Sequence, residues 1–269
     1  MSDILLKVEN LSIAFGGLKA VDDLSFEMNT GEIYGIIGPN GAGKTTAFNC
    51  ITQFYRPNSG KIMYRAKKPA KNSDITKDKL INLVGKRPHE IIALGLVRTF
   101  QNVELINSLS VIDNLLVGAH AAFKAGLASQ ILRLPKARAE ERALRRKADD
   151  VLAALGLSAV RDLPAVMQPY GLQKMIELGR TLMLEPRLII LDEPAAGLNE
   201  AETMSLAQTV KTIAKDYKCG ILLIEHDMNF VSNVCERICA ISFGKLLAIG
   251  TPEEIKANKT VQEAYLGTE

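Results

Sequence analysis

Several residue types are scarce in this chain, and their scarcity excludes whole classes of site. The 269 residues include no tryptophan, and aromatic residues make up only 5%. There are four scattered cysteines with no CxxC pair, which argues against zinc ligation or a disulfide framework and favours small core residues in a reducing compartment: Cys50, Cys219, Cys235 and Cys239. A three-histidine metal site would need all three histidines, from three distant segments, which is not how such ligands are usually spaced: His89, His120 and His226.

Long apolar runs are also missing. The longest candidates, Leu188–Leu191 and Ile221–Ile224, have the length of strands, whereas a membrane span needs about 20 apolar residues. The N-terminus has no basic region followed by an apolar stretch, so no signal peptide is expected. Yet the mean hydropathy is +0.08, which leans apolar for such a chain. We therefore expect part of the apolar surface to serve interfaces with other subunits.

The formal net charge is only +3, but it is unevenly spread. Segment 61–87 holds nine basic and two acidic residues, and segment 133–147 holds seven basic and two acidic residues. Clustered bases can bind nucleic acid or anionic lipid, although a solvated helix face or hairpin is the commoner explanation. Neither segment has the interleaved aromatic residues of a single-strand binding surface, so we expect no nucleic-acid partner.

Hydrophobic periodicity predicts an α/β fold. Strand and helix patterns alternate at both ends of the chain, and a helical block lies between them, which indicates an α/β core interrupted by a helical subdomain. The predicted strands are 5–9, 24–28, 33–37, 187–191, 220–225, 238–243 and 246–249, with a hairpin in 61–87. The predicted helices are 44–53, 110–155 with an interruption at 118–134, 172–183, 200–214, 228–235 and one beginning at 253.

A phosphate-binding loop follows the predicted strand 33–37. Its residues fit the pattern G-x-x-x-x-G-K-[ST]: Gly38, Pro39, Asn40, Gly41, Ala42, Gly43, Lys44, Thr45 and Thr46. The glycines let successive amides face one anion, and the next helix adds its positive N-terminus. Lys44 is predicted to reach the β- and γ-phosphates of a nucleotide and Thr45 to bind Mg²⁺. A dinucleotide fingerprint is a weaker match, because the required acidic residue about 20 positions on is missing.

A second motif is an apolar strand that ends in two acids, Asp192 and Glu193. Such a strand delivers its carboxylates to the edge of the sheet where α/β proteins bind ligands. Asp192 is predicted to hold Mg²⁺, directly or through water, and Glu193 to polarise a water in line with the γ-phosphate. The two motifs together predict a nucleotide with β- and γ-phosphates, bound with Mg²⁺.

The motif order resembles that of the ATP-binding subunits of ABC transporters over essentially the whole chain. Residues 38–46 match the family's Walker A loop, 188–193 its Walker B strand and 194–199 its D-loop. The resemblance implies a P-loop ABC ATPase fold with a RecA-like core and an antiparallel β subdomain in 1–100 and 180–269, and a helical subdomain in 101–179. It also assigns three single residues: Phe15 to adenine stacking, Gln101 to sensing Mg²⁺ and the membrane partner, and His226 to the γ-phosphate.

Within that family, the chain is most similar to the G-type ATPase of high-affinity branched-chain amino-acid importers. The similarity lies in Phe15–Val21, Asp192–Asn199, Gly250–Ile255 and the terminal Ala264–Gly267, and in the long basic insertion near 124–147. It implies import of branched-chain amino acids, or of a related amino acid or amide, through two permease subunits and a solute-binding protein. It also implies a peripheral location on the cytoplasmic face of the inner membrane.

The chain departs from the family at the signature motif, which caps the γ-phosphate of a partner's ATP. Pro169 replaces the usual serine and offers neither a hydroxyl nor an amide proton. The matching residues are Pro169, Tyr170, Gly171, Leu172 and Gln173. If the subunit pairs with a paralogous ATPase rather than with itself, this change predicts two unequal ATP sites.

Two other functions stay open at the level of sequence. The basic segments are the support for an ABC-type ATPase that acts on nucleic acid, but that class usually has coiled-coil insertions or tandem ATPase domains. The altered signature supports a degenerate subunit that binds ATP and relies on a paralogue for hydrolysis. The intact Lys44, Asp192, Glu193 and His226 argue against it.

Overall fold

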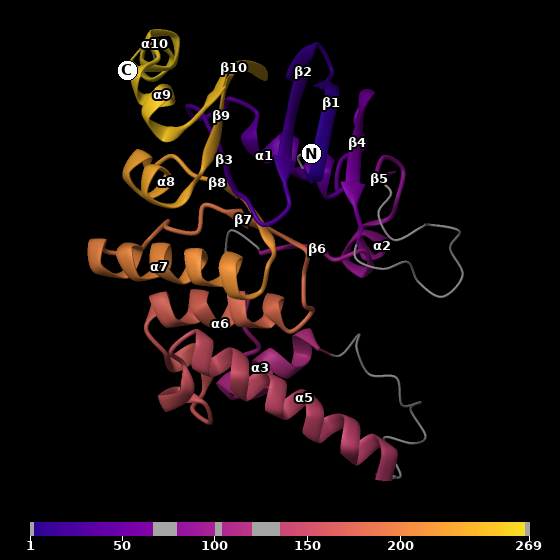
Figure 1. The fold of residues 1–269 in the computed structure, drawn as a ribbon, viewed down its shortest axis with the longest axis vertical. Coiled ribbons are helices and arrows are strands. Elements are labelled where there is room, and N and C mark those ends of the chain that lie inside the picture. Colours follow the sequence, from indigo (N-terminus) through magenta and orange to yellow (C-terminus); the bar gives the residue numbers. More distant parts are fainter. Residues whose placement is uncertain (1–2, 67–79, 100–103, 120–134, 267–269) are drawn as a thin grey trace. The chain divides into compact units, whose positions relative to one another are not determined.

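The computed structural model describes residues 3–66, 80–99, 104–119 and 135–266. The chain forms two compact units (Figure 1). The first combines residues 1–98 and 186–269, and the second is the continuous segment 99–185. Both sheets belong to the first unit.

A four-stranded antiparallel sheet is built mainly from the N-terminal segment, with the strand order β2-β1-β4-β5. The long strands β1 and β2 form a hairpin that closes at Gly16-Gly17, and Phe15 pairs with Leu18 at its end. Alternate residues of β1 are buried, as expected for a sheet with one face on the core. The strands are β1 (Ile4–Phe15), β2 (Leu18–Asn29), β4 (Ser59–Arg65) and β5 (Leu80–Asn82).

A six-stranded sheet has the order β10-β9-β3-β8-β7-β6, and only the pair β9–β10 is antiparallel. Its central strands β3, β7 and β8 are buried at every position, which explains their unbroken apolar sequences. The strands are β3 (Ile33–Ile37), β6 (Leu96–Arg98), β7 (Leu188–Asp192), β8 (Gly220–Ile224), β9 (Arg237–Ser242) and β10 (Lys245–Gly250).

Helix α1 (Lys44–Ile51) packs in the main core of the first unit, between the two sheets (Figure 1). This core joins Phe48 of α1 to Ile36 of β3 and to apolar residues of β1, β2 and β4. Gly35, whose side of β3 is opposite to that of Ile36, faces Val231 and Cys235 at the end of α8. The six-stranded sheet is therefore covered on both faces, which fixes β3 and the start of α1 firmly.

Helices α7 to α10 of the first unit follow strands β7, β8 and β10 of the six-stranded sheet. Helix α7 (Glu200–Asp216) begins at a capping box made by Asn199 and Glu202. Asp227 caps α8 (Met228–Val234), and Thr251 caps α9 (Pro252–Ala257), which is followed by α10 (Lys259–Leu266). No helix in the described ranges is long and apolar enough to cross a membrane.

The second unit is helical, with α3 (Val111–Gly118), α5 (Pro135–Ala154) and α6 (Tyr170–Leu182) packed together. Gly118 of α3 lies so close to α6 that an added Cβ would be 2.3 Å from the carbonyl oxygen of Arg180. The buried Asn114 side chain accepts a hydrogen bond from Arg180 Nη2 (2.9 Å) and holds the loop before α3. These contacts bind the start and the end of the unit together.

The predicted α/β class is confirmed, and most predicted strands and helices are found with ends shifted by no more than two residues. Strands β1 and β2 are the exceptions, because each extends six residues beyond the predicted strand at one end. All four cysteines are buried and free, as predicted. The signature-region helix begins at Tyr170 rather than Leu172, because Pro169 supplies the N-cap backbone. The short helix α2 (Pro88–Ala93) and strand β6 were not predicted from the sequence. The predicted interruption at 118–134 and the loop of the 61–87 hairpin lie largely outside the described residues.

Candidate functional site

The phosphate loop runs from the end of β3 to the start of α1, and its backbone requires glycine at three positions. Gly38, Gly41 and Gly43 have φ values of +158°, +78° and +98°. The buried Lys44 folds back over the loop, and its Nζ donates to the carbonyl oxygens of Gly38 (2.7 Å) and Pro39 (3.0 Å). The N–H groups of the first turn of α1 have no partner within the helix, so they point out toward the loop as anion donors.

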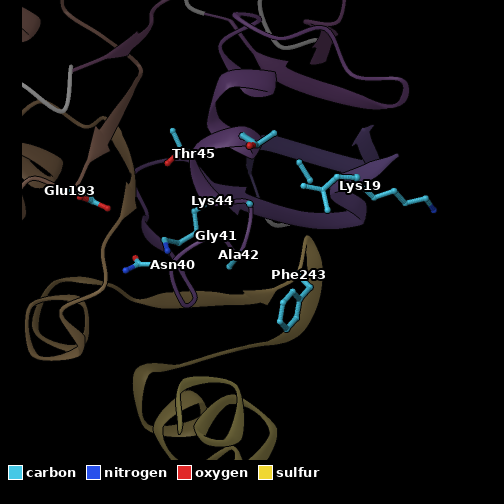
Figure 2. A pocket seen from close by; sticks show the side chains of 12 residues that line it. Lys19, Asn40, Gly41, Ala42, Lys44, Thr45, Glu193 and Phe243 are labelled. Carbon is cyan, nitrogen blue, oxygen red and sulfur yellow. The ribbon is translucent and has the colours of Figure 1, made fainter. Parts of the chain in front are cut away.

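A cavity of about 390 Å³ opens over this loop (Figure 2). That volume lies within the range of small-molecule sites, about 300–1,000 Å³. Figure 2 shows Glu193 at one end of the cavity, Phe243 at the other end, and the phosphate loop with Lys44 between them. The lining residues are Leu18, Lys19, Ala20, Asn40, Gly41, Ala42, Gly43, Lys44, Thr45, Thr46, Glu193 and Phe243.

Gly43 is one of two positions in the loop, with Gly38, where an added side chain would collide with the backbone of another strand. An added Cβ would lie 2.2 Å from the carbonyl oxygen of Ala20 in β2, and φ is in the left-handed region. We expect Gly43→Ala to destabilise the chain by on the order of 3 kcal/mol, because strain and overpacking add. Gly41→Ala is the matched control for overpacking, since Gly41 also has a left-handed φ (+78°) but an added Cβ there meets nothing within 4 Å. Urea unfolding of both variants measures the difference, and equal losses would contradict the steric argument.

Asp192, at the end of β7, is buried and paired with a guanidinium that the sequence analysis did not single out. Arg98 Nη2 lies 2.5 Å from Asp192 Oδ2, and Arg98 Nη1 donates to Asn49 Oδ1 of α1 at 2.6 Å. The side chains of Arg98 and Asp192 are 15% and 3% exposed. Arg98 therefore joins three elements around the site, namely β6, β7 and α1, and sets the orientation of the carboxylate.

Glu193 follows Asp192 with its backbone in the left-handed region, at φ +47°. A non-glycine residue there costs about 1–3 kcal/mol and is typical of functional positions. The amide of Glu193 donates to the carbonyl oxygen of Ile224 (3.0 Å), which ties the turn after β7 to the end of β8. The turn directs the half-buried Glu193 side chain into the cavity lining (Figure 2).

Glu225 is a second residue that sequence reasoning missed. Its buried carboxylate accepts hydrogen bonds from the amides of Ala195 (2.7 Å) and His226 (3.1 Å). One carboxylate thus connects the turn after β7 to the turn after β8. The signal in the sequence was an acid placed directly after the four apolar residues Ile221–Ile224. The imidazole of His226 is 58% exposed, and its Nδ1 lies 3.7 Å from Glu225 Oε2.

Burial of Glu225 predicts a pH dependence of stability. Burial raises the pKa of the Glu225 carboxyl, and the amide hydrogen bonds offset part of that shift. The folded chain therefore holds this proton more tightly than the unfolded chain. The carboxyl accordingly costs stability as the pH rises from about 4.3, the ordinary value, through the raised pKa. Each unit of pKa difference corresponds to about 1.4 kcal/mol.

Glu225→Gln removes this titration. We expect the free energy of unfolding of the variant, relative to the original chain, to be higher at pH 7 than at pH 4. Urea unfolding at both pH values measures the difference. A relative stability that is the same at the two pH values would contradict the prediction.

The remaining predicted site residues fall in different places. Phe15 lies outside the cavity lining; it is 48% exposed and its ring packs edge-on against Tyr55, with centroids 5.3 Å apart. Gln101 lies outside the described residues. In the second unit, Pro169 is the N-cap of α6, and Tyr170, Gly171, Leu172 and Gln173 form its first turn.

The signature segment has internal hydrogen bonds that hold its loop. Gln173 Nε2 donates to the carbonyl oxygens of Val166 (3.0 Å) and Gln168 (2.8 Å). Gly171 is buried, whereas Tyr170 is 42% exposed and packs beneath the Lys174 ammonium, which lies 5.3 Å from the ring centroid. Pro169 provides no side-chain cap for α6, so the helix N-terminus keeps its own amides as donors.

The donor set at the cavity fits Mg²⁺ bound with a nucleotide. Within the described ranges, no group of three or more histidine, cysteine or acidic side chains converges. Mg²⁺ at phosphate sites commonly takes one or two protein oxygens and receives the rest from phosphates and water. Thr45 in the cavity lining carries an oxygen of that kind, and so does Asp192, which precedes Glu193 and whose Oδ2 pairs with Arg98.

Comparison with protein families gives two matches. A family model described as ABC transporter matches residues 21–196. A second, described as branched-chain amino acid ATP-binding cassette transporter, matches residues 245–269. The first match takes in both candidate phosphate-site motifs, and the second takes in strand β10 and the C-terminal helices α9 and α10.

Relatives and solved structures match along the whole chain. The high-affinity branched-chain amino acid transport ATP-binding protein LivG of Salmonella typhimurium is 42% identical over 268 residues, with 99% of each chain covered. BraF of Pseudomonas aeruginosa, which has the same description, is 37% identical over 267 residues, also with 99% of each covered. The crystal structure of the ADP conformation of MJ1267, an ATP-binding cassette of an ABC transporter, has a TM-score of 0.81 and 30% identity, with 98% of this chain and 99% of that chain covered.

The fold and the loop over α1 define a P-loop nucleotide-binding ATPase. More narrowly, the chain belongs to the ABC transporter family, as an ATP-binding subunit. Subunits of this kind work with membrane permease subunits, and the predicted fold class and ATPase activity are confirmed.

Proposed function

We propose that this chain hydrolyses ATP to drive import of branched-chain amino acids through two membrane permease subunits. The match of residues 245–269 to the branched-chain family model carries the substrate class, because it lies outside the part that matches ABC transporters in general. The names of LivG and BraF support the same class. The comparisons give no support to the alternative in which a paralogue hydrolyses ATP for this chain.

The residues of the cavity are proposed to divide the chemistry among them. Lys44 and the loop amides from Gly38 to Thr46 bind the phosphates, and the helix N-terminus adds its positive end. Thr45, Asp192 and Gln101 hold Mg²⁺, which when bound neutralises charge on the phosphates.

Two further residues are proposed to act at the γ-phosphate. Glu193 orients and deprotonates the attacking water, and His226 contacts the γ-phosphate. The cavity lining supports the role of Glu193, which stands on the same side of the loop as Thr45 in Figure 2.

The subunit is proposed to act as a dimer at the cytoplasmic face of the membrane, with a paralogous ATPase or with a second copy of itself. In the dimer, the signature residues Pro169 to Gln173 meet the partner's ATP. We keep the proposed division of the chain into a core with a β subdomain (1–100 and 180–269) and a helical subdomain (101–179). A solute-binding protein on the other side of the membrane supplies the amino acid, and nucleic acid plays no part.

Uptake by reconstituted vesicles tests the proposal. The chain is combined with two permease subunits, a paralogous ATPase and a solute-binding protein from the same organism, and radiolabelled leucine, isoleucine and valine are offered, with urea as the comparison solute. We expect ATP-dependent uptake of the three amino acids that is lost in Lys44→Ala. Uptake of urea alone, or leucine uptake that persists in Lys44→Ala, would reject the proposal.

A further inference from the structure

Phe243, in the cavity lining, combines an exposed aromatic ring with a backbone conformation that large residues rarely adopt. It is 83% exposed, and its backbone φ is +47°. Ser242 pairs with Lys245 across a two-residue turn, in which Gly244 also has a positive φ, +77°. Positive φ at both turn residues is the pattern of a type I′ turn, for which Asn-Gly is the preferred sequence. A large aromatic residue at the first position is strained in the backbone and exposes its ring to water.

The turn has a fixed place beside the phosphate loop. The amide of Gly244 donates to the Ala42 carbonyl oxygen (2.9 Å), and the Gly244 carbonyl oxygen accepts from the Asp22 amide (2.8 Å). The β9–β10 turn is therefore held both to the phosphate loop and to β2, just beyond Leu18 and Lys19. These bonds keep the Phe243 ring at the rim of the cavity.

The cavity has two chemically different ends. Lys44, Thr45 and Glu193 mark the end for the phosphates, and Phe243 lies at the opposite end, next to the hairpin that carries Lys19 (Figure 2). Leu18, also in the lining, is 72% exposed. A nucleoside triphosphate whose phosphates lie on the loop would place its base at the apolar end.

We propose that Phe243 is a nucleotide-binding residue, held in a strained turn so that its ring packs on the base of ATP at the end of the cavity away from Glu193. The proposal rests on the proposed function, because it takes ATP as the ligand. Phe243 would contribute one side of the binding site for the base, and this side comes from the β9–β10 hairpin. It is distinct from the predicted stacking residue Phe15, which lies outside the cavity lining.

Replacing the ring by the residue that the turn prefers should have opposite effects on folding and on binding. Phe243→Asn is expected to raise the melting temperature of the chain without nucleotide by about 2–4 °C, since the strain is relieved. It is also expected to weaken ATP binding about 10-fold, the size of a lost aromatic contact with a base. Binding of inorganic tripolyphosphate, which has no base, should not change.

Calorimetric titration of the full chain with ATP and with tripolyphosphate measures both affinities. Phe243→Trp should keep ATP affinity, and Leu246→Asn, on the same hairpin but outside the lining, should change neither ligand. If Phe243→Asn binds ATP with unchanged affinity, the inference about Phe243 is overturned, whereas the proposed function still stands. Equal losses for ATP and tripolyphosphate would also overturn it, because the turn rather than the ring would then matter. Failure of the original chain to bind ATP would overturn the proposed function and this inference together.

Discussion

Glu193→Gln is expected to lower ATP turnover by about 10²- to 10⁴-fold while ATP still binds. The amide keeps the size and shape of the carboxylate but cannot accept a proton from water, and general-base catalysis contributes a factor of that order. The left-handed backbone at Glu193 and its place in the cavity lining support this role. Phosphate release and binding of a fluorescent ATP analogue, measured on the assembled transporter, separate turnover from binding.

Glu200→Gln is a suitable control, because Glu200 is an exposed acid in the first turn of α7. It should change turnover little. A similar loss in both variants would show that negative charge near the site, rather than the carboxylate of Glu193, is what matters.

If the partner is a paralogous ATPase, the altered signature at Pro169 predicts that the same substitution has different effects in the two subunits. In the proposed heterodimer, Glu193 would act on the ATP that faces the partner's signature, whereas the altered signature of this chain would face the partner's ATP. We therefore expect Glu193→Gln to cost more turnover than the matching change in the partner. Equal losses from the two changes would remove the idea of unequal sites.

Arg98→Met is expected to destabilise the first unit by about 3–5 kcal/mol, because it leaves the buried Asp192 carboxylate without its cation. In a chain of this size that corresponds to a fall of about 10 °C in melting temperature. The variant should also lose the hydrogen bond to Asn49 that joins β6 to α1. Urea unfolding and thermal melting without nucleotide measure the effect apart from catalysis.

Two further variants make this test specific. Arg98→Met combined with Asp192→Asn should recover at least half of the lost stability, because no uncompensated charge is then buried. Arg161→Met breaks the exposed pair with Asp149 in the second unit and should have a small effect. A double variant no more stable than Arg98→Met would show that packing of the Arg98 side chain, not its charge, supports the site.

The motifs could be predicted from the sequence because each is local. Strand β3, the loop and α1 are contiguous, and four apolar residues before Asp192 define a buried strand. The partners of these motifs could not be predicted in the same way. Arg98 meets Asp192 across 94 residues of sequence, and Glu225 reaches the Ala195 amide across 30. Neither pairing leaves a periodic signal, since each depends on which strands become neighbours in the sheet.

Neither helix α2 nor Phe243 as a cavity residue was predicted from the sequence, and the reasons differ. Helix α2 is six residues long, too short for a periodic apolar face, although Pro88 at its start and the Glu90 side chain on the Arg87 amide (2.7 Å) are helix-start signals. Phe243 occupies a turn whose usual residue is asparagine, so local preference there favours a different amino acid. At this turn, the residue that goes against local preference also lines the cavity.

Because its four native cysteines are buried, the chain is suited to site-specific labelling at an introduced cysteine. Burial raises the pKa of Cys50 to about 11 and those of Cys219 and Cys239 to about 12, and it raises the pKa of Cys235 as well. Since the thiolate is the reactive form, the folded chain should be nearly inert to maleimides at neutral pH. A single cysteine introduced on the surface can then carry a fluorophore without removal of the native thiols. Conversely, modification of the native thiols would record each opening of the core.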